Sequence, residues 1–226
     1  MLKRLLFVVS LFAFAQLANS QLAYRFSNFN INNGLSQSSV TSIVQDKVGT
    51  IWAGTQDGIN RFDGQQFQVF TPDNTRGLES GFILSSHAAK NGFLWFGTSN
   101  GLTAFDPIQE RFTTYFLSNK ITFPVEEIAE DTAGNLYLAT ATRGLAFWNK
   151  STKNTQLLHI NLPSKHVHYI KFLTAKMLLI STEDKGVFTY NILNKQLKKC
   201  FSLQVNNKKL IINDVEWYSG SVFLLG

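Results

Sequence analysis

Residues 40–63 read V-T-S-I-V-Q-D-K-V-G-T-I-W-A-G-T-Q-D-G-I-N-R-F-D, and this stretch decides the fold because it returns along the chain. The second copy, forty-three residues later, keeps Gly92, Trp95, Gly97, Thr98, Gly101, Phe105 and Asp106. The third keeps Val125, Ile128, Asp131, Gly134, Tyr137, Thr140, Gly144 and Asn149, and the fourth Val167, Ile170, Leu179, Thr182, Gly186 and Asn191. A fifth begins with Ile212, Val215 and Leu224. A period of this length predicts stacked supersecondary units, with β-propeller blades as the leading candidate.

Each repeat contains the signals of four short strands. In the first, β-rich runs at 40–46, 50–55, 59–63 and 67–71 are separated by turn-forming Asp and Gly residues. Four antiparallel strands joined by tight turns make one blade. We therefore expect an all-β propeller of about four and a half blades in an incomplete ring. The expected blade ranges are approximately 38–80, 81–123, 124–164, 165–203 and, in part, 204–226.

The second strand of each repeat alternates large and small side chains. Trp52, Trp95, Tyr137 and Leu179 are the large residues, and Gly54, Gly97, Ala139 and Ser181 follow two places later. Because a blade cannot bury its apolar face alone, we expect the large residues to fill the space between blades and the small ones to permit close backbone approach. A carbohydrate-stacking role for the tryptophans is the alternative.

The first twenty residues have the pattern of a cleaved secretory signal. Lys3 and Arg4 precede an apolar run at 5–15, and small residues at 18–20 precede Gln21. The run is too short to span a membrane. Cys200 is the one cysteine, so disulfides cannot supply the stability. Because the chain is expected to be exported, we expect no nucleic acid among its partners.

Charge is distributed unevenly along the chain. Residues 21–142 carry seven Lys or Arg against eleven Asp or Glu, whereas residues 143–226 carry twelve against four. The basic half could attract an anionic ligand. Solvated lysines that protect sheet edges are the simpler interpretation.

The run G-L-S-Q-S-S-V-T-S-I-V-Q-D-K-V-G-T-I-W-A-G-T-Q-D-G-I-N-R-F-D-G-Q-Q-F at 34–67 closely resembles the first blade of the two-component regulator propeller family. The copy N-G-F-L-W-F-G-T-S-N-G-L-T-A-F-D at 91–106 matches as well; the next two match with losses, since Tyr137 replaces Trp and Lys176 replaces the turn Gly. The resemblance implies the periplasmic sensor region of a membrane-bound regulator, often a hybrid histidine kinase anchored in the inner membrane. It also implies an oligosaccharide ligand, and further blades and a kinase as partners within one polypeptide.

The sequence contains only weak indications of catalytic or metal-binding residues. Glu126, Glu127 and Glu130 share one expected inner strand and could supply the paired acids of a glycosidase. His159, His166 and His168 could hold a metal, although no spaced carboxylate or thiolate accompanies them. We expect no enzyme activity, no cofactor and no metal. Two alternatives to a sensor remain: a secreted propeller glycan hydrolase or lyase, and a non-catalytic binding or scaffold propeller. The chain could also pair with a second copy as a homodimer.

The loop between the second and third strands lies on the same rim of a blade as the loop leaving the fourth. Function in propellers concentrates on such loops because a rigid scaffold holds them. We therefore predict ligand contacts on that rim from Asp57, Asn74, Arg76, Asn100 and Arg143. Local turn propensity is the competing explanation for the Asn and Asp residues.

Two expectations concern the ends of the sequence. Because the fifth copy stops at Gly226 within its second strand, we expect the chain to be a piece of a larger propeller protein. Residues 24–30 have alternating apolar positions and are expected to form a strand of a closing blade whose partner strands lie beyond residue 226, so amide exchange should find them poorly protected in this chain. Reading the source gene beyond codon 226 tests the first expectation, and a natural stop codon there would contradict it.

Overall fold

The computed structural model describes residues 26–117 and 120–201, together with the backbone of 204–205, 208–209, 214–218 and 221–225. Its main part is four sheets, each of four antiparallel strands paired in sequence order. The first contains β1 (Val40–Gln45), β2 (Ile51–Thr55), β3 (Gly58–Phe62) and β4 (Phe67–Phe70). The second contains β5 (Ile83–Ala88), β6 (Leu94–Thr98), β7 (Leu102–Asp106) and β8 (Arg111–Tyr115). The third contains β9 (Val125–Glu130), β10 (Leu136–Thr140), β11 (Gly144–Asn149) and β12 (Asn154–Leu157). The fourth contains β13 (Val167–Thr174), β14 (Met177–Thr182), β15 (Gly186–Asn191) and β16 (Gln196–Phe201).

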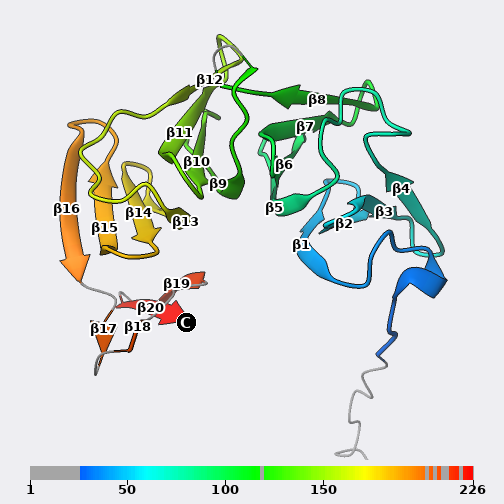
Figure 1. Cartoon of the computed structure of the whole chain (residues 1–226), viewed down its shortest axis with the longest axis horizontal. Helices are drawn as coiled ribbons and strands as arrows, with labels where there is room; N and C mark the ends of the chain where they lie inside the picture. Colours follow the sequence, from blue (N-terminus) through cyan, green and yellow to red (C-terminus); the bar gives the residue numbers. More distant parts are fainter. Residues whose placement is uncertain are drawn as a thin grey trace, which may run out of the picture.

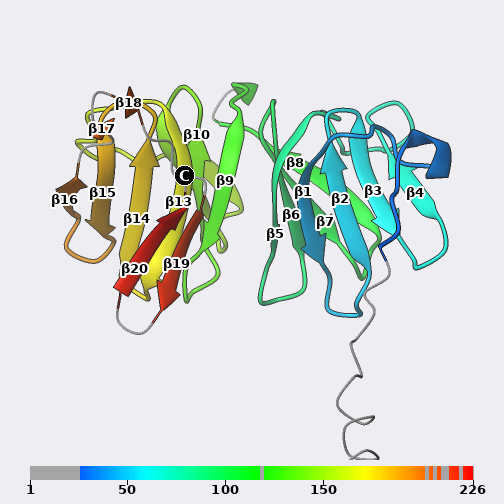
Figure 2. The ribbon, with the colours of Figure 1, turned by 90° about the horizontal axis from the view of Figure 1, so that it is seen from below.

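The four sheets are blades arranged along an open arc. The first strands, β1, β5, β9 and β13, lie on the concave side, and the fourth strands lie on the convex side (Figure 1). Seen from below in Figure 2, the strands of neighbouring blades stand side by side. The predicted all-β propeller with four-stranded antiparallel blades is therefore confirmed, and the described strands do not close into a ring.

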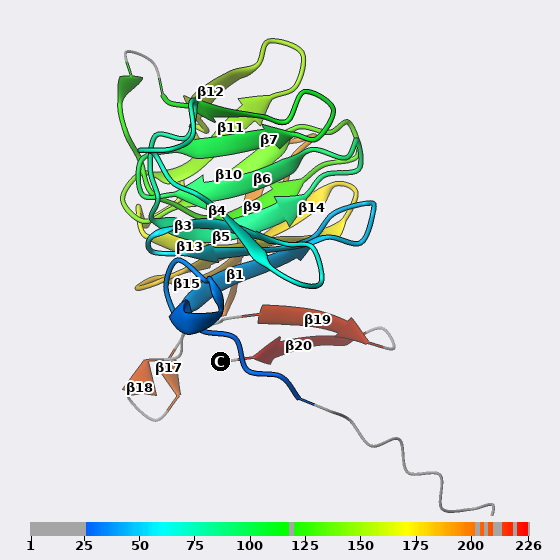
Figure 3. The same ribbon diagram turned by 90° about the vertical axis from the view of Figure 1, so that its right-hand side faces the viewer.

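Two short hairpins follow the fourth blade. β17 (Gln204–Val205) pairs with β18 (Lys208–Lys209), a hairpin that the repeat pattern does not predict. β19 (Asp214–Tyr218) pairs antiparallel with β20 (Ser221–Leu225) and lies beside β13. Figure 3 shows both hairpins apart from the stacked blades. The signal sequence expected at residues 1–20 lies outside the described residues.

The repeated Asp and Asn residues close the hairpins between strands. Asp46 Oδ1 accepts from the N–H groups of Val48 and Thr50, while its Oδ2 accepts from Trp52 Nε1 at 3.0 Å. Between third and fourth strands, a side-chain oxygen of each of Asp63, Asp106, Asn149 and Asn191 accepts from two backbone N–H groups of its own turn. This local bonding explains the recurrence of these residues, as the sequence pattern indicates.

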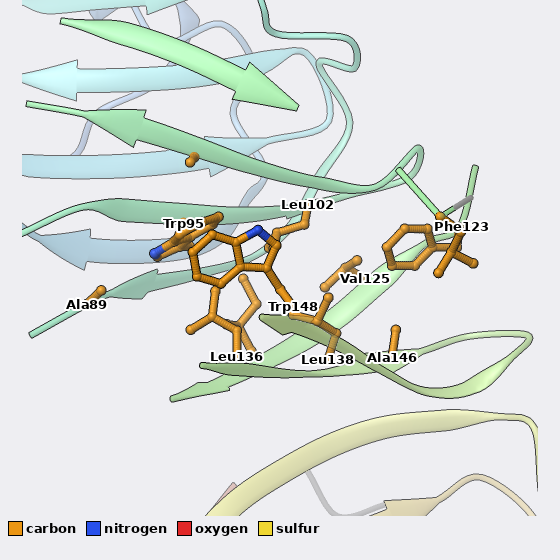
Figure 4. Close-up of a cluster of buried hydrophobic side chains, with 12 residues drawn as sticks. Ala89, Trp95, Leu102, Phe123, Val125, Leu136, Leu138, Ala146 and Trp148 are labelled. Carbon is orange, nitrogen blue, oxygen red and sulfur yellow. The ribbon is translucent and has the colours of Figure 1, made fainter. Parts of the chain in front are cut away.

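Large side chains of the second strands fill the space between blades. Trp52 is 1% exposed and lies 4.6 Å, centroid to centroid, from Phe105 of the second blade. Trp95 packs edge-on against Trp148 of the third blade at 4.5 Å (Figure 4). Tyr137 contacts Phe172 of the fourth blade at 5.3 Å. These three residues are core, which confirms the packing interpretation and removes the tryptophans as a sugar-stacking platform.

Glycines in the second strands let the next blade approach closely. A Cβ atom added at Gly97 would lie 2.4 Å from the carbonyl oxygen of Val125, the first residue of β9. One added at Gly54 would lie 2.5 Å from Cγ2 of Ile83, the first residue of β5. At the same seam Thr41 Oγ1 donates to the carbonyl of Ile83 at 2.9 Å. The predicted role of these two glycines is therefore confirmed.

The strand expected at 24–30 would pair with strands beyond residue 226, so it stays a prediction; the described residues 26–30 have this conformation. Residues 26–30 pair with no described strand, and the chain turns at Asn30, which caps the 3₁₀ helix η1 (Ile31–Asn33). Phe29 packs against Phe62 at 5.1 Å and Phe67 at 5.5 Å, on the β3–β4 hairpin, while Phe26 is 93% exposed. Within the described residues, Phe29 is thus held by an aromatic contact with the first blade, and Phe26 is left exposed.

The close contacts at Gly97 and Gly54 predict that one added methyl group lowers the free energy of unfolding by different amounts at the two positions. Gly97→Ala should lower the free energy of unfolding by about 1–3 kcal/mol, because the new Cβ meets a backbone oxygen that cannot move alone. Gly54→Ala should cost less, since the Ile83 methyl and the Ser42 hydroxyl can shift. Urea unfolding measures both. Gly81→Ala is the control, because its Cβ would meet no atom nearer than 3.4 Å; equal losses in all three variants would contradict this account.

Candidate functional site

The turn between second and third strands is built in the same way in every blade. A fully buried Thr ends the second strand, and its hydroxyl donates to the carbonyl of the Gly that opens the third: Thr55 to Gly58, Thr98 to Gly101, Thr140 to Gly144 and Thr182 to Gly186. The same hydroxyl accepts a backbone N–H from the residue before that Gly, namely Asp57, Asn100, Arg143 or Lys185. The turn is therefore held by the Thr and the backbone.

Three of the predicted ligand residues occupy this position. Asp57 and Arg143 are exposed, and Asn100 is half-buried. Asn100 Nδ2 donates to the carbonyl of Glu79 at 3.3 Å, so its amide helps to hold the crossover between the first two blades. Asp57 and Arg143 are linked to the turn through their backbone N–H groups.

The other two predicted residues lie in the crossover at 71–82. Asn74 is committed to this loop: its Oδ1 accepts from the N–H of Thr71, and its Nδ2 donates to the carbonyl of Val69. Arg76 is exposed, and no side-chain hydrogen bond or ion pair engages it within the described residues. Local turn bonding, the competing explanation, thus accounts for Asn74.

Three of the five predicted residues line two separate grooves on the convex side. We call the first groove 1–2: it has a volume of about 530 Å³, lies between β4 and β8, and is lined by Asn74 and Arg76. We call the second groove 3–4: it has a volume of about 450 Å³, lies between the third and fourth blades, and is lined by Arg143. Asp57 and Asn100 line neither of the two. The structure therefore places all five on one rim but does not gather them into one pocket.

A third hollow faces the concave side. It has a volume of about 580 Å³ and is lined by residues of β5, β9 and β13, among them His87, Glu127, Glu130 and Lys171. Glu130 Oε2 lies 3.4 Å from His87 Nε2 and accepts from the N–H of Lys90 at 3.1 Å. This carboxylate, whose side chain is 6% exposed, connects the second and third blades. Sequence analysis missed the pairing because His87 has no equivalent in the repeat.

The three glutamates of β9 occupy different environments. Glu127 and Glu130 line the concave hollow, whereas Glu126 does not. Glu126 is the extra residue of a β-bulge, since the pairing with β10 passes from Val125 to Glu127. The same shift recurs at Thr41, Leu84 and His168 in the other three blades. Burial raises the pKa of the Glu126 carboxyl.

The histidines considered for a metal are not brought together with other ligands. His159 lines groove 3–4, whereas His168 occupies the bulge of β13. Within the described residues, no group of three or more His, Cys, Asp or Glu side chains could hold a metal ion. The metal alternative thus gains no support from this part of the chain.

One rim carboxylate was not selected from the sequence. Asp184, in the β14–β15 turn, accepts from Ser164 Oγ at 2.6 Å and lies 3.1 Å from Lys185 Nζ. The hydrogen bond from Ser164 is the main reason that the pKa of the Asp184 carboxyl is lowered. This contact joins the crossover into the fourth blade to that blade's own turn, and turn propensity alone could not have distinguished Asp184 from its neighbours.

Comparison with known proteins gives one match to a family model. The model described as two component regulator propeller matches residues 34–57, from the end of η1 to the β2–β3 turn. Histidine kinase P4 of Formosa agariphila is 46% identical over 68 residues, which are 28% of this chain and 5% of that kinase. The resemblance stated from the sequence is therefore confirmed for the first blade.

Solved structures with a similar fold include an extracellular domain of a two component system and a lyase. The extracellular domain of a hybrid two component system from B. thetaiotaomicron has a TM-score of 0.75 at 22% identity, covering 88% of this chain and 29% of that domain. A virginiamycin B lyase from Staphylococcus aureus has a TM-score of 0.65 at 13% identity, covering 85% of this chain and 64% of the lyase. At these identities the likeness shows the fold alone. The chain spans less than a third of the length of the B. thetaiotaomicron extracellular domain.

Among the described residues, no helix is both long and apolar enough to cross a membrane.

The raised pKa of Glu126 predicts a pH-dependent stability difference. An acid whose pKa is higher in the folded state than in the unfolded state loses stability as pH rises from its unfolded pKa through its folded pKa. Glu126→Gln, which cannot ionise, should therefore gain stability relative to the wild type between pH 4 and pH 7. Denaturant unfolding at both pH values measures this difference. Glu79→Gln, at an exposed position, is the control; a Glu126→Gln difference that is the same at both pH values would contradict the prediction.

Proposed function

We propose that this chain is an extracytoplasmic ligand-sensing propeller segment of a two-component regulatory protein and that its ligand is an oligosaccharide. The observation that carries the proposal is the two component regulator propeller match at residues 34–57. That stretch contains Trp52 and Gly54, the residues through which the first blade stacks on the second. Identity to a histidine kinase over 68 residues supports the same protein class.

Export is part of the proposal. Residues 1–20 have the pattern of a secretory signal, and one structural relative is described as an extracellular domain. A sensor of this type works outside the cytoplasm, with the remainder of its polypeptide, including a kinase, carrying the signal across the inner membrane. A second copy of the chain is an additional partner in this arrangement.

The geometry is suited to binding. Four rigid blades present one turn each on the same rim, and each turn is held by backbone hydrogen bonds to a buried Thr. Loops on a rigid scaffold are where propellers and other β-folds place ligand contacts. Arg76 and Arg143, the predicted contacts with charged side chains, each line a groove large enough for a small saccharide.

A secreted lyase is the second candidate, because a virginiamycin B lyase shares the fold. The two candidates differ in what happens to the bound molecule. A sensor binds its ligand and releases it unchanged, whereas a lyase or hydrolase converts it.

Calorimetry on the complete exported region, with short oligosaccharides from neutral, carboxylated and sulfated polysaccharides, tests the proposal. We expect one class to bind without cleavage and to change autophosphorylation of the full-length regulator in membrane vesicles. Cleavage of the bound saccharide would favour the enzyme instead, and binding without any change in phosphorylation would contradict the sensor.

The rim residues can be tested in the same assay. Arg76→Ala or Arg143→Ala should weaken binding of the identified oligosaccharide about tenfold, the loss typical of one charge-assisted hydrogen bond. If both variants bind with wild-type affinity, the rim assignment is wrong, although the sensor function stands.

A further inference from the structure

Grooves 1–2 and 3–4 occupy corresponding places in the repeat. Each lies along a fourth strand, β4 or β12, and receives a residue from the third-to-fourth-strand turn of the next blade. That residue is Glu110 in groove 1–2 and Lys195 in groove 3–4. Both adopt the left-handed backbone conformation, with φ of 48° and 58° respectively. The chain therefore contains two versions of one groove, and they can be compared residue by residue.

Groove 1–2 contains one acidic residue beside two basic ones. Glu110 lies among the lining residues together with Arg76 and Arg111. Its Oε1 is 3.4 Å from Nη1 of Arg61, a residue of β3 in the first blade. The acidic turn residue thus offsets the basic side chains around it and has a partner within the protein.

Groove 3–4 has basic groups without acidic ones. Arg143, Lys195 and His159 line it, and none of its described lining residues is acidic. The position that corresponds to Arg61 is Phe147, so Lys195 faces a different neighbour from that of Glu110. Within the described part of the chain, no hydrogen bond or ion pair engages the side chains of Arg143, His159 or Lys195. These groups come from the β10–β11 turn, the chain leaving β12 and the β15–β16 turn.

The remaining lining of groove 3–4 combines apolar and hydrogen-bonding groups. Leu117 and Leu157 provide apolar surface, and Gln156 contributes an amide. Tyr190, which is 2% exposed, also lines the groove, and its hydroxyl is a hydrogen-bond donor and acceptor at neutral pH. A sugar ring has one less polar face and many hydroxyls, and such a lining offers partners for both.

We propose that groove 3–4 binds an oligosaccharide carrying carboxylate or sulfate groups, with Arg143 and Lys195 as its anion contacts. A guanidinium can bond two oxygens of one carboxylate or sulfate, and an ammonium acts as a point charge. The volume of about 450 Å³ lies in the range of small-molecule sites. This inference rests on the proposed sensor function and specifies the chemistry of the ligand.

The test uses the complete exported region and matched pairs of saccharides. One pair is an oligogalacturonate and the same oligomer after carboxyl reduction; the other is a sulfated galactan oligosaccharide and its desulfated form. We expect one charged member to bind and its uncharged form to bind at least about tenfold more weakly. Binding should also weaken as salt rises, because ions screen exposed charges. The pair that responds identifies whether carboxylate or sulfate is recognised.

Substitutions then locate the site. Arg143→Ala and Lys195→Glu should each reduce the affinity for the charged oligosaccharide about tenfold or more. Lys195→Glu copies the residue that the same turn carries in the second blade, so its backbone conformation is already compatible with Glu. Lys153→Glu, at an exposed position in the corresponding turn of the third blade, is the matched control: it lines neither groove and should leave this affinity unchanged. Unchanged melting temperatures would show that the variants remain folded.

The outcomes separate the inference from the function on which it rests. Equal binding of charged and uncharged saccharides, or wild-type affinity in both groove 3–4 variants, would overturn the inference and leave the sensor function standing. Loss of binding in Arg76→Ala with none in Arg143→Ala would also overturn it, since the ligand would then occupy groove 1–2. Failure of all four saccharides and of the wider panel to bind would overturn both.

Discussion

The structure depends on the fact that a single blade cannot bury its own apolar face. In the first three blades, the second strand therefore carries a large residue that fills the seam to the next blade. In the first two, it also carries a glycine that brings the next inner strand into contact. Trp52 and Gly54 show the two requirements together: the indole needs apolar neighbours from the second blade, and the missing Cβ makes room for Ile83. The open arc and the regular placement of the rim turns follow from repeating this contact.

The seams are not identical, and their differences follow the sequence. In the third blade, Tyr137 replaces Trp and Ala139 replaces Gly, and Asp131 binds Asn135 Nδ2 where Asp46 binds the Trp52 indole. Between the second and third blades, the half-buried Glu130 and His87 add a polar contact on the concave side. Stability in this protein is therefore a sum of local seams, each with its own chemistry.

The repeat allowed the fold to be predicted, because each strand and turn is specified by residues close to it in sequence. Thr55, Gly58 and Asp63 act within their own hairpins, so spacing alone revealed their roles. The strand expected near Phe29 stays a prediction, because a strand requires a partner edge and its expected partners lie beyond residue 226. For the site, the rim positions were found from topology. The sequence did not reveal that Asn74 and Asn100 are used by the fold, or that Arg76 and Arg143 lie in separate grooves, since both facts depend on contacts between distant segments.

The residue before the first Gly of each third strand is Asp57, Asn100, Arg143 or Lys185: one acid, one amide and two bases. Its contribution to the turn is a backbone N–H bonded to the buried Thr, which every amino acid except proline can supply. The turn itself therefore places little selection on the side chain at this position, although the Asn100 amide also binds the Glu79 carbonyl. One side chain per blade on the rim can therefore be substituted while the fold is kept. Related propellers can acquire new ligand specificities in this way without passing through an unstable intermediate sequence.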